Sequence, residues 1–336
     1  RLHVIITPTD DANPGEGGGG FAGLSTFGTI SPVAWVFNLE EYAAADTISH
    51  EIGHVMGLSH DAQLTDQYYG GHGTGVTSWA PIMGAAWSED NSSGYYEYVT
   101  QWSRGEYTDA DNQEDDLAMI AANGFGFRED DWADSSTPGV NDPMLGDYLV
   151  DADGNFTASG LIHKSSDVDV FRIAANVGQI SLMIMPLDVQ SIANETGSNT
   201  PGANLAVNVR LLDSAGNVLL DATDDDALFA AINYASFGEI FYLEVSGGAR
   251  GVDPTVGFSE YASVGYYNIS GTIPPAPLAV SSKGGKLQFP VLDGATTTST
   301  ADYSLTTAPV AVLVVVAAGV PVSAQRLLIA KKLVSI

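Results

Sequence analysis

Two histidines four residues apart, with a glutamate between them, are the side chains of this sequence best suited to chemistry. His50, Glu51 and His54 form the pattern H-E-x-x-H. Residues four apart on a helix share one face, so both imidazoles can reach a single metal ion. Glu51 would then lie beside that metal, where it could take a proton from a bound water. The pattern predicts a helix that carries two zinc ligands and a general base.

The residues that follow supply a turn and a third ligand. Gly57 stands where the helix must end, because glycine accepts the positive φ that such a turn usually needs. The turn would deliver His60 as a third ligand and leave a fourth position open for water, which indicates a catalytic zinc site. Three of the six histidines fall in this one segment. An amphipathic helix with incidental histidines is the weaker alternative.

The complete spacing, H-E-x-x-H-x-x-G-x-x-H, resembles the signature of the metzincin zinc metalloproteases. Asp61, directly after His60, makes it similar to the reprolysin-like (adamalysin-like) branch. The resemblance implies a Met-turn beneath the metal, and Met83 in a Pro-Ile-Met-Gly segment fits it. It also implies an edge strand over residues 20–25 that borders the substrate cleft and pairs with extended peptides. The site residues expected on that strand are Gly20, Phe21, Ala22 and Gly23.

The elements expected around the site make an α+β domain over residues 1–127. Apolar runs predict strands at residues 2–7, 21–27 and 33–37. The zinc helix is expected to begin near residues 39–42 and to end at Gly57. An acidic first turn favours a second helix over residues 114–122, with Asp115 and Asp116 as caps rather than metal ligands.

The chain opens directly on its first apolar run, without the first strand and long helix that metzincins place earlier. It has no initiating methionine or signal peptide. The expectation is therefore an N-terminally truncated, metzincin-like catalytic domain in a fragment or processed form.

The second half of the chain has a different character. Residues 128–145 are polar and rich in breakers, which is typical of a linker. Short alternating strands then predict an all-β antiparallel sandwich over residues 146–274. The motifs DVDVF at 167–171 and YNISG at 267–271 resemble the bacterial pre-peptidase C-terminal (PPC-like) domain, which follows many secreted proteases. The resemblance leaves open that the sandwich is removed during maturation.

The tail, residues 275–336, allows two interpretations. Residues 308–324 are apolar but interrupted by prolines and a glycine, which puts them at the lower limit for crossing a bilayer. Attachment to a membrane or cell surface is one interpretation, with basic residues following the run. Buried strands of a partial β-module are the other, and the valines and prolines favour it slightly.

Composition restricts the partners. The chain carries 41 acidic and 12 basic residues and a net charge of −29, so it repels nucleic acid and anionic headgroups. Cysteine is absent, which removes thiolate zinc ligands and fits a secreted bacterial protein.

Calcium is a second candidate cofactor. The segment DADGN at residues 151–155 is similar to the start of a calcium-binding loop. Ile162, however, occupies the twelfth position, where an EF-hand needs a bidentate acid. A turn whose Asp bonds its own backbone is the default there, and calcium at a site of another kind stays open.

These patterns together predict a secreted zinc endopeptidase acting on proteins or peptides. His50, His54 and His60 would hold Zn²⁺ as neutral imidazoles, and Glu51 would be the general base. The alternative is a catalytically incomplete domain that serves as a zinc-bearing adhesion or binding module.

Overall fold

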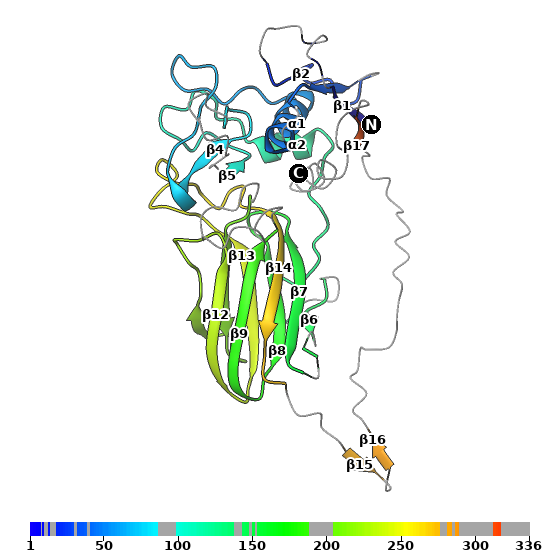
Figure 1. Cartoon of the computed structure of the whole chain (residues 1–336), viewed down its shortest axis with the longest axis vertical. Helices are drawn as coiled ribbons and strands as arrows, with labels where there is room; N and C mark the ends of the chain where they lie inside the picture. Colours follow the sequence, from blue (N-terminus) through cyan, green and yellow to red (C-terminus); the bar gives the residue numbers. More distant parts are fainter. Residues whose placement is uncertain are drawn as a thin grey trace.

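The computed structural model describes residues 1–7, 9, 13, 18–29, 32–38, 41–86, 99–137, 143–147, 150, 151, 153–187, 204–275, 281–283, 286–288 and 312–316. Within them, a small sheet and two α-helices form an N-terminal unit, and two larger sheets form a β-sandwich next to it (Figure 1). None of the helices described is long and apolar enough to cross a membrane.

The N-terminal sheet has the strand order β17-β1-β3-β2. β1 (Leu2–Ile6) lies between β3 (Val33–Val36) and β17 (Val312–Val316) and runs parallel to both. β2 (Gly20–Ala22) is antiparallel to β3 and forms the other edge. Alternate residues of β1 are fully buried, as expected for a strand whose one face is covered.

Two segments of this sheet differ from the sequence-based expectation. The strand expected over residues 21–27 ends at Ala22, because Leu24 and Ser25 lie in a turn where Ser25 has a φ of 54°. In the tail, Val312 pairs with Leu2, an arrangement that neither interpretation of the tail contains. The rest of the apolar run, residues 308–311 and 317–324, lies outside the described residues.

α1 (Glu41–Met56) packs on this sheet through an apolar stripe and ends one residue before Gly57. The residues of its buried face, all at most 1% exposed, are Ala44, Ile48, Ile52 and Val55. α2 (Asp116–Ala122) packs against the same core. Asp115 is its N-cap and accepts a hydrogen bond from Ala118 N at 2.9 Å, so it serves as the cap that the acidic first turn predicts.

A short parallel pair lies on the side of the N-terminal unit that faces the sandwich (Figure 1). It consists of β4 (Trp79–Pro81) and β5 (Val99–Gln101), and the 3₁₀ turn Gly75–Thr77 precedes it. All six residues of the pair are buried, which is unusual for so short an element and shows that both its faces are covered.

The second half of the described chain is a β-sandwich, which confirms the sequence prediction. One sheet, in the order β11-β10-β13-β8-β6, consists of β6 (Gly146–Asp147), β8 (Val168–Ala174), β10 (Val207–Leu212), β11 (Val218–Asp221) and β13 (Ile240–Gly247). The other, in the order β12-β9-β14-β7, consists of β7 (Asn155–Ile162), β9 (Val177–Pro186), β12 (Ala230–Phe237) and β14 (Gly265–Thr272). Their pairing is antiparallel except between β6 and β8, which are parallel. β15 (Ser281–Lys283) and β16 (Lys286–Gln288) form a separate hairpin.

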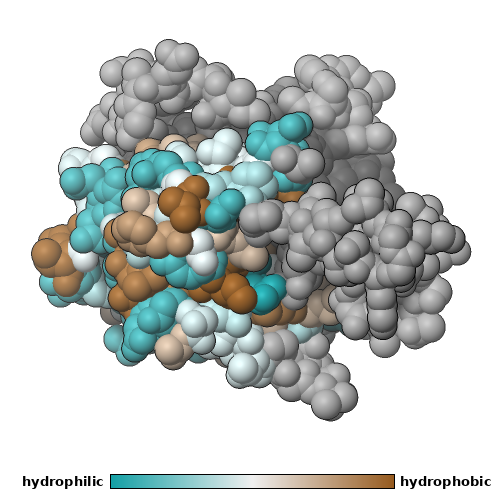
Figure 2. Space-filling view, turned by 90° about the horizontal axis from the view of Figure 1, so that it is seen from below, coloured by the Kyte–Doolittle hydropathy of each residue, from teal (hydrophilic) through white to brown (hydrophobic). Residues whose placement is uncertain are grey.

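Inward-facing residues of both sheets make one core, in which Phe171, Phe241 and Tyr267 are fully buried. The end of the sandwich away from the N-terminal unit is different. Figure 2 looks onto this end, where apolar side chains are exposed. Val177, at the start of β9, pairs with Phe237, at the end of β12, and both are exposed. Burial therefore differs sharply between two phenylalanines only four residues apart.

This contrast gives a stability test. Phe241→Ala removes a side chain that is 0% exposed, and we expect it to lower the free energy of unfolding by about 3–5 kcal/mol. Phe237→Ala removes one that is 77% exposed and should change it by less than about 0.5 kcal/mol. Urea unfolding of both variants measures the difference, and similar losses would contradict this core.

Candidate metal centre

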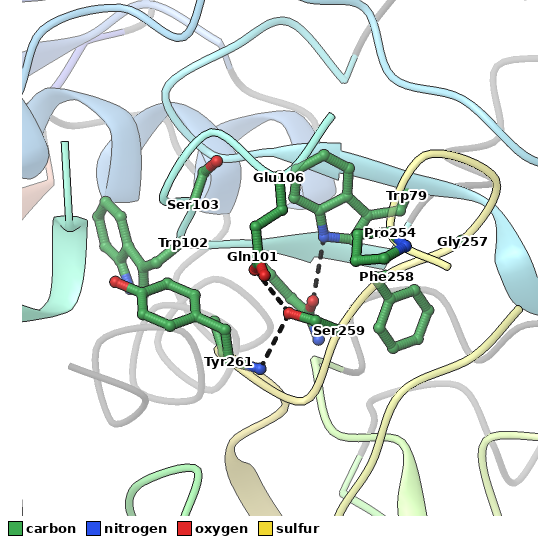
Figure 3. A pocket seen from close by; sticks show the side chains of 11 residues that line it. Trp79, Gln101, Trp102, Ser103, Glu106, Pro254, Gly257, Phe258, Ser259 and Tyr261 are labelled. Carbon is green, nitrogen blue, oxygen red and sulfur yellow. Dashed lines mark hydrogen bonds between the residues drawn. The ribbon is translucent and has the colours of Figure 1, made fainter. Parts of the chain in front are cut away.

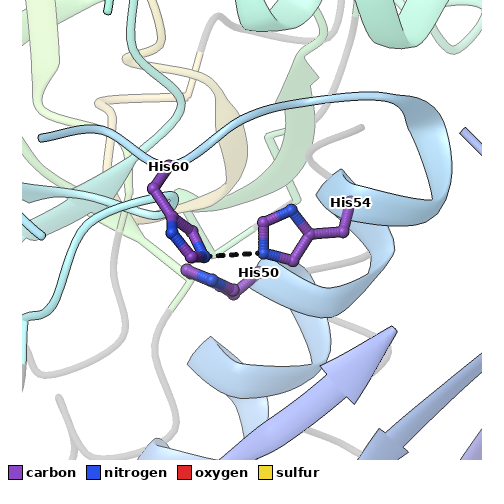
Figure 4. A group of neighbouring side chains, drawn as sticks. All are labelled: His50, His54 and His60. Atoms are coloured by element: carbon purple, nitrogen blue, oxygen red, sulfur yellow. Dashed lines mark hydrogen bonds between the residues drawn. The ribbon is translucent and has the colours of Figure 1, made fainter. Parts of the chain in front are cut away.

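Three histidines converge at the end of α1 (Figure 4). His50 and His54 project from successive turns of the helix, and His60 comes from the segment that turns back after it. One ring nitrogen from each lies within 4.8 Å of the corresponding nitrogens of the other two. The structure thus brings together all the metal ligands that the sequence predicts.

Gly57 produces the turn that delivers His60. Its φ is +105°, in the region that favours glycine. Gly57 N donates to His54 O at 2.9 Å, and Leu58 N donates to Gly53 O at 2.9 Å. These two bonds form a Schellman motif, which satisfies the last carbonyls of the helix and reverses the chain.

Main-chain carbonyls orient two of the imidazoles. His50 Nδ1 lies 2.8 Å from Ile82 O, and His54 Nδ1 lies 2.8 Å from Leu58 O. A carbonyl oxygen can only accept, so each Nδ1 must carry the proton and each neutral Nε2 keeps its lone pair. His54 Nε2 and His60 Nε2 lie 2.9 Å apart. Carbonyl acceptors of this kind commonly fix the tautomer of metal-binding histidines.

Burial keeps the three imidazoles neutral. It lowers the pKa of His50 to about 3 and that of His60 to about 4, with the neighbouring His54 adding to both shifts. Burial also lowers the pKa of His54. The neutral form is the one that binds a metal, so the ligands need not lose protons near neutral pH.

Glu51, next to His50 in α1, has one carboxylate oxygen without a hydrogen-bond partner among the described residues. Its side chain is 6% exposed, and no described residue hydrogen-bonds to its buried Oε2. Burial raises the pKa of Glu51 to about 8. A buried carboxyl group without a partner is costly unless it performs a task, such as binding a cation or moving a proton.

The predicted edge strand passes next to Glu51. A Cβ built on Gly20 would stand 2.7 Å from Glu51 Oε1, so only glycine lets β2 come this close. Phe21 is 47% exposed, Ala22 packs partly into the core, and Gly23 follows the strand.

Met83, the methionine expected beneath the metal, is fully buried under α1. A Cβ on Gly53 would collide with Met83 Sδ, so glycine in the middle of the helix makes room for the sulfur. Met83 O accepts a hydrogen bond from Asp61 N at 2.9 Å, which ties the segment of His60 to the methionine. Burial, followed by repulsion from Glu114, raises the pKa of the Asp61 carboxyl to about 7.

The donor set suits zinc. Three neutral imidazoles with a free carboxylate nearby match the nitrogen ligands of catalytic Zn²⁺, whereas Ca²⁺ and Mg²⁺ prefer oxygen.

Tyr68 belongs to the same site, although no sequence spacing points to it. Its ring centroid lies 4.2 Å from that of His60 and 6.1 Å from that of His50. Burial, followed by the charge of Glu51, raises the pKa of its hydroxyl. His72, by contrast, has a structural place between Tyr69 OH at 2.7 Å and Gly257 O at 2.6 Å.

A second cluster of side chains that could hold a metal ion lies where the linker meets the sandwich. It comprises two overlapping groups, Asp130 with His163 and Asp167, and Asp130 with Asp131 and Asp169. No sequence spacing points to it, because only the fold brings residues 130–131 next to residues 163–169. Asp151, in contrast, accepts hydrogen bonds from Asp153 N at 2.9 Å and Asn155 N at 2.8 Å, and so forms the self-bonded turn expected for it.

Comparisons with known proteins add little to what the structure shows. No protein-family model matches the chain, and no curated protein matches it. Among solved structures, one match is the pre-peptidase C-terminal domain of a collagenase from Bacillus anthracis, at 12% sequence identity and a TM-score of 0.25. The match covers 40% of this chain and 97% of that chain. A likeness this distant assigns neither a family nor an activity.

The packing of Met83 under α1 predicts a large effect of one methyl group. Gly53→Ala would favour the helix by about 1 kcal/mol on propensity alone. Because the methyl group meets Met83 Sδ, we expect overpacking to outweigh this and the variant to be less stable by about 1–3 kcal/mol. Gly126→Ala, with no atom within 4 Å of the added Cβ, is the control. Chemical denaturation measures both; a stabilised Gly53→Ala would refute this packing.

Proposed function

We propose that the chain is a zinc-dependent endopeptidase of the metzincin type, with an α+β catalytic domain joined to a PPC-like β-sandwich. One observation carries the proposal: three neutral imidazoles converge within 4.8 Å beside a buried glutamate whose Oε2 has no partner among the described residues. His50, His54 and His60 are the proposed ligands, and Glu51 is the proposed general base.

In the proposed hydrolysis, the metal and Glu51 have different roles. When bound, Zn²⁺ polarises a carbonyl group and makes water more acidic. Glu51 accepts the proton of the attacking water at its free oxygen and passes it to the leaving amine. Burial raises the pKa of Glu51 to about 8 in the metal-free site, and a bound cation would favour the ionised carboxylate that accepts the proton.

The edge strand supports a polypeptide substrate. β2 pairs only with β3 among the described strands, so its outer edge is free to pair with an extended peptide. Gly20 on this strand adjoins Glu51, which would bring the main chain of a bound peptide past the general base. Main-chain pairing gives affinity with little sequence selectivity.

We also propose that the protein is secreted from a bacterium, and the composition supports this. A net charge of −29 and the absence of cysteine suit a secreted bacterial protein and argue against nucleic-acid partners. Attachment to a membrane or cell surface through residues 308–324 stays a prediction.

An adhesion or binding module that holds zinc without hydrolysing peptides is the alternative. Cleavage of casein or gelatin that stops with a chelator and returns with Zn²⁺ supports the peptidase. Zinc binding without cleavage supports the module.

Replacing the general base separates metal binding from hydrolysis. Glu51→Gln keeps the shape of the side chain but cannot take the proton, so we expect kcat/KM to fall by about 10²–10⁴-fold. Bound zinc per chain, measured by mass spectrometry, should be unchanged because Glu51 is not a ligand. Glu129→Gln, at an exposed position, is the matched control. Full activity in Glu51→Gln would refute the mechanism.

We propose that Ca²⁺ binds to the cluster of Asp130, Asp131 and Asp169 at the junction between the linker and the sandwich. Asp167 and Asp169 are both 0% exposed, and Oδ1 of each has no hydrogen-bond partner among the described residues. Oxygen atoms of Asp130, Asp131 and Asp169 lie within 4.8 Å of one another. Three carboxylates this close repel each other unless a hard cation or protons compensate. Such a cation would fasten the linker to the sandwich.

Calcium should then stabilise the sandwich. At a Ca²⁺ concentration a hundred times the dissociation constant, we expect about 2.7 kcal/mol of added stability, seen as a higher Tm that EGTA reverses. Asp169→Asn should abolish the Ca²⁺ effect, because it removes a central ligand charge. The exposed Asp226→Asn should retain it. A Tm that does not respond to Ca²⁺ in the unaltered chain would rule the site out.

A further inference from the structure

The sandwich and the N-terminal unit share a buried contact. The loop between β13 and β14 and the start of β10 reach the β4–β5 pair (Figure 1). An apolar cluster crosses the boundary: the N-terminal unit contributes Tyr69, Trp79, Val99 and Tyr107, and the sandwich contributes Ala206, Leu228 and Phe258. All of its members are at most 7% exposed, so separating the two bodies would expose a continuous apolar surface.

Gln101, at the end of β5, is the polar centre of this contact (Figure 3). Its side chain is buried, at 2% exposure. Nε2 donates to Asn204 O of the sandwich at 2.6 Å, and Oε1 accepts from Trp79 Nε1 at 3.0 Å. One amide group therefore joins the sandwich to both strands of the pair.

The same residue leads to the metal centre through the main chain. Gln101 O accepts a hydrogen bond from Ile82 N at 2.8 Å. Ile82 O in turn accepts the Nδ1 proton of His50 at 2.8 Å. Three consecutive hydrogen bonds thus run from the sandwich through Gln101 and Ile82 to His50.

The sandwich loop is held in place at several other points. His72 Nε2 lies 2.6 Å from Gly257 O. Tyr261 OH donates to Asp115 Oδ1 at 2.6 Å and accepts from Leu117 N at 2.9 Å, at the start of α2. Arg250, 1% exposed, donates to Ala227 O and Val207 O and so fixes the base of the loop. The loop is attached on both sides of the contact.

We propose that the sandwich is a permanent structural partner of the N-terminal unit and that Gln101 is a positioning residue for His50. The side-chain bond of Gln101 to Asn204 fixes β5 against the sandwich, which we call the bracing of β5. The main chain of β5 positions Ile82, and Ile82 O fixes the orientation and tautomer of the His50 imidazole. This differs from a sandwich that is removed during maturation. The expected effect on metal affinity rests on the proposed zinc site, whereas the bracing of β5 does not.

The test replaces only the side chain that bridges the two bodies. Gln101→Met keeps nearly the same volume and the main-chain bond to Ile82, but loses the hydrogen bonds to Asn204 and Trp79. Gln179→Met, on an exposed position of β9, is the matched control. Phe258→Leu, entirely on the sandwich side, is a second and milder variant should Gln101→Met fold poorly.

Two measurements on the full chain test the bracing of β5 and the positioning of His50. In the metal-free protein, amide hydrogen exchange of residues 79–84 should be at least about tenfold faster in Gln101→Met and unchanged in Gln179→Met. Zn²⁺ affinity should fall by about 10–100-fold, with a shifted absorption spectrum of the Co²⁺-substituted protein.

Each outcome has a distinct meaning. Exchange at the rate of the unaltered chain would overturn the bracing of β5. Faster exchange with unchanged Zn²⁺ affinity and Co²⁺ spectrum would overturn the positioning of His50. If the unaltered chain binds no Zn²⁺, the proposed function fails, and the exchange rates still decide whether the sandwich braces β5.

Discussion

The hydrogen bond from His50 Nδ1 to Ile82 O is the interaction on which the rest of the site depends. It decides which nitrogen of His50 faces the other histidines, and it joins α1 to the turn that contains Met83. Without this acceptor, the His50 imidazole could adopt either tautomer and more than one ring orientation. The bond therefore fixes the orientation of one of the three candidate metal ligands, as Leu58 O does for His54.

Burial then sets the electrostatics of the site in one direction. It lowers the pKa of His50 and His60 and raises that of Glu51. These shifts all disfavour charge, so the metal-free site is close to neutral although the chain carries a net charge of −29. A bound dication reverses the preference of Glu51 and favours its ionised form. The metal-free site therefore carries little charge, and a bound cation would be balanced by the ionised Glu51.

Sequence alone predicted the parts of the site that are local along the chain. The helical spacing of His50 and His54, the glycine turn and the alternation of the sandwich strands all follow from neighbouring residues. The acceptors Ile82 O and Leu58 O could not be found in this way, because every residue has a carbonyl and only the fold selects which one meets an imidazole. Tyr68, Gln101 and the pairing of Val312 with Leu2 likewise depend on contacts that carry no spacing signal.

We propose that three imidazoles of this chain hold one zinc ion. X-ray absorption at the zinc edge, on the full chain loaded with one equivalent of Zn²⁺, tests it most directly. We expect only nitrogen and oxygen to coordinate the ion, at about 2.0–2.1 Å, with three imidazoles and no sulfur. Fewer than three imidazoles, or the same spectrum from a His60→Ala variant, would contradict it.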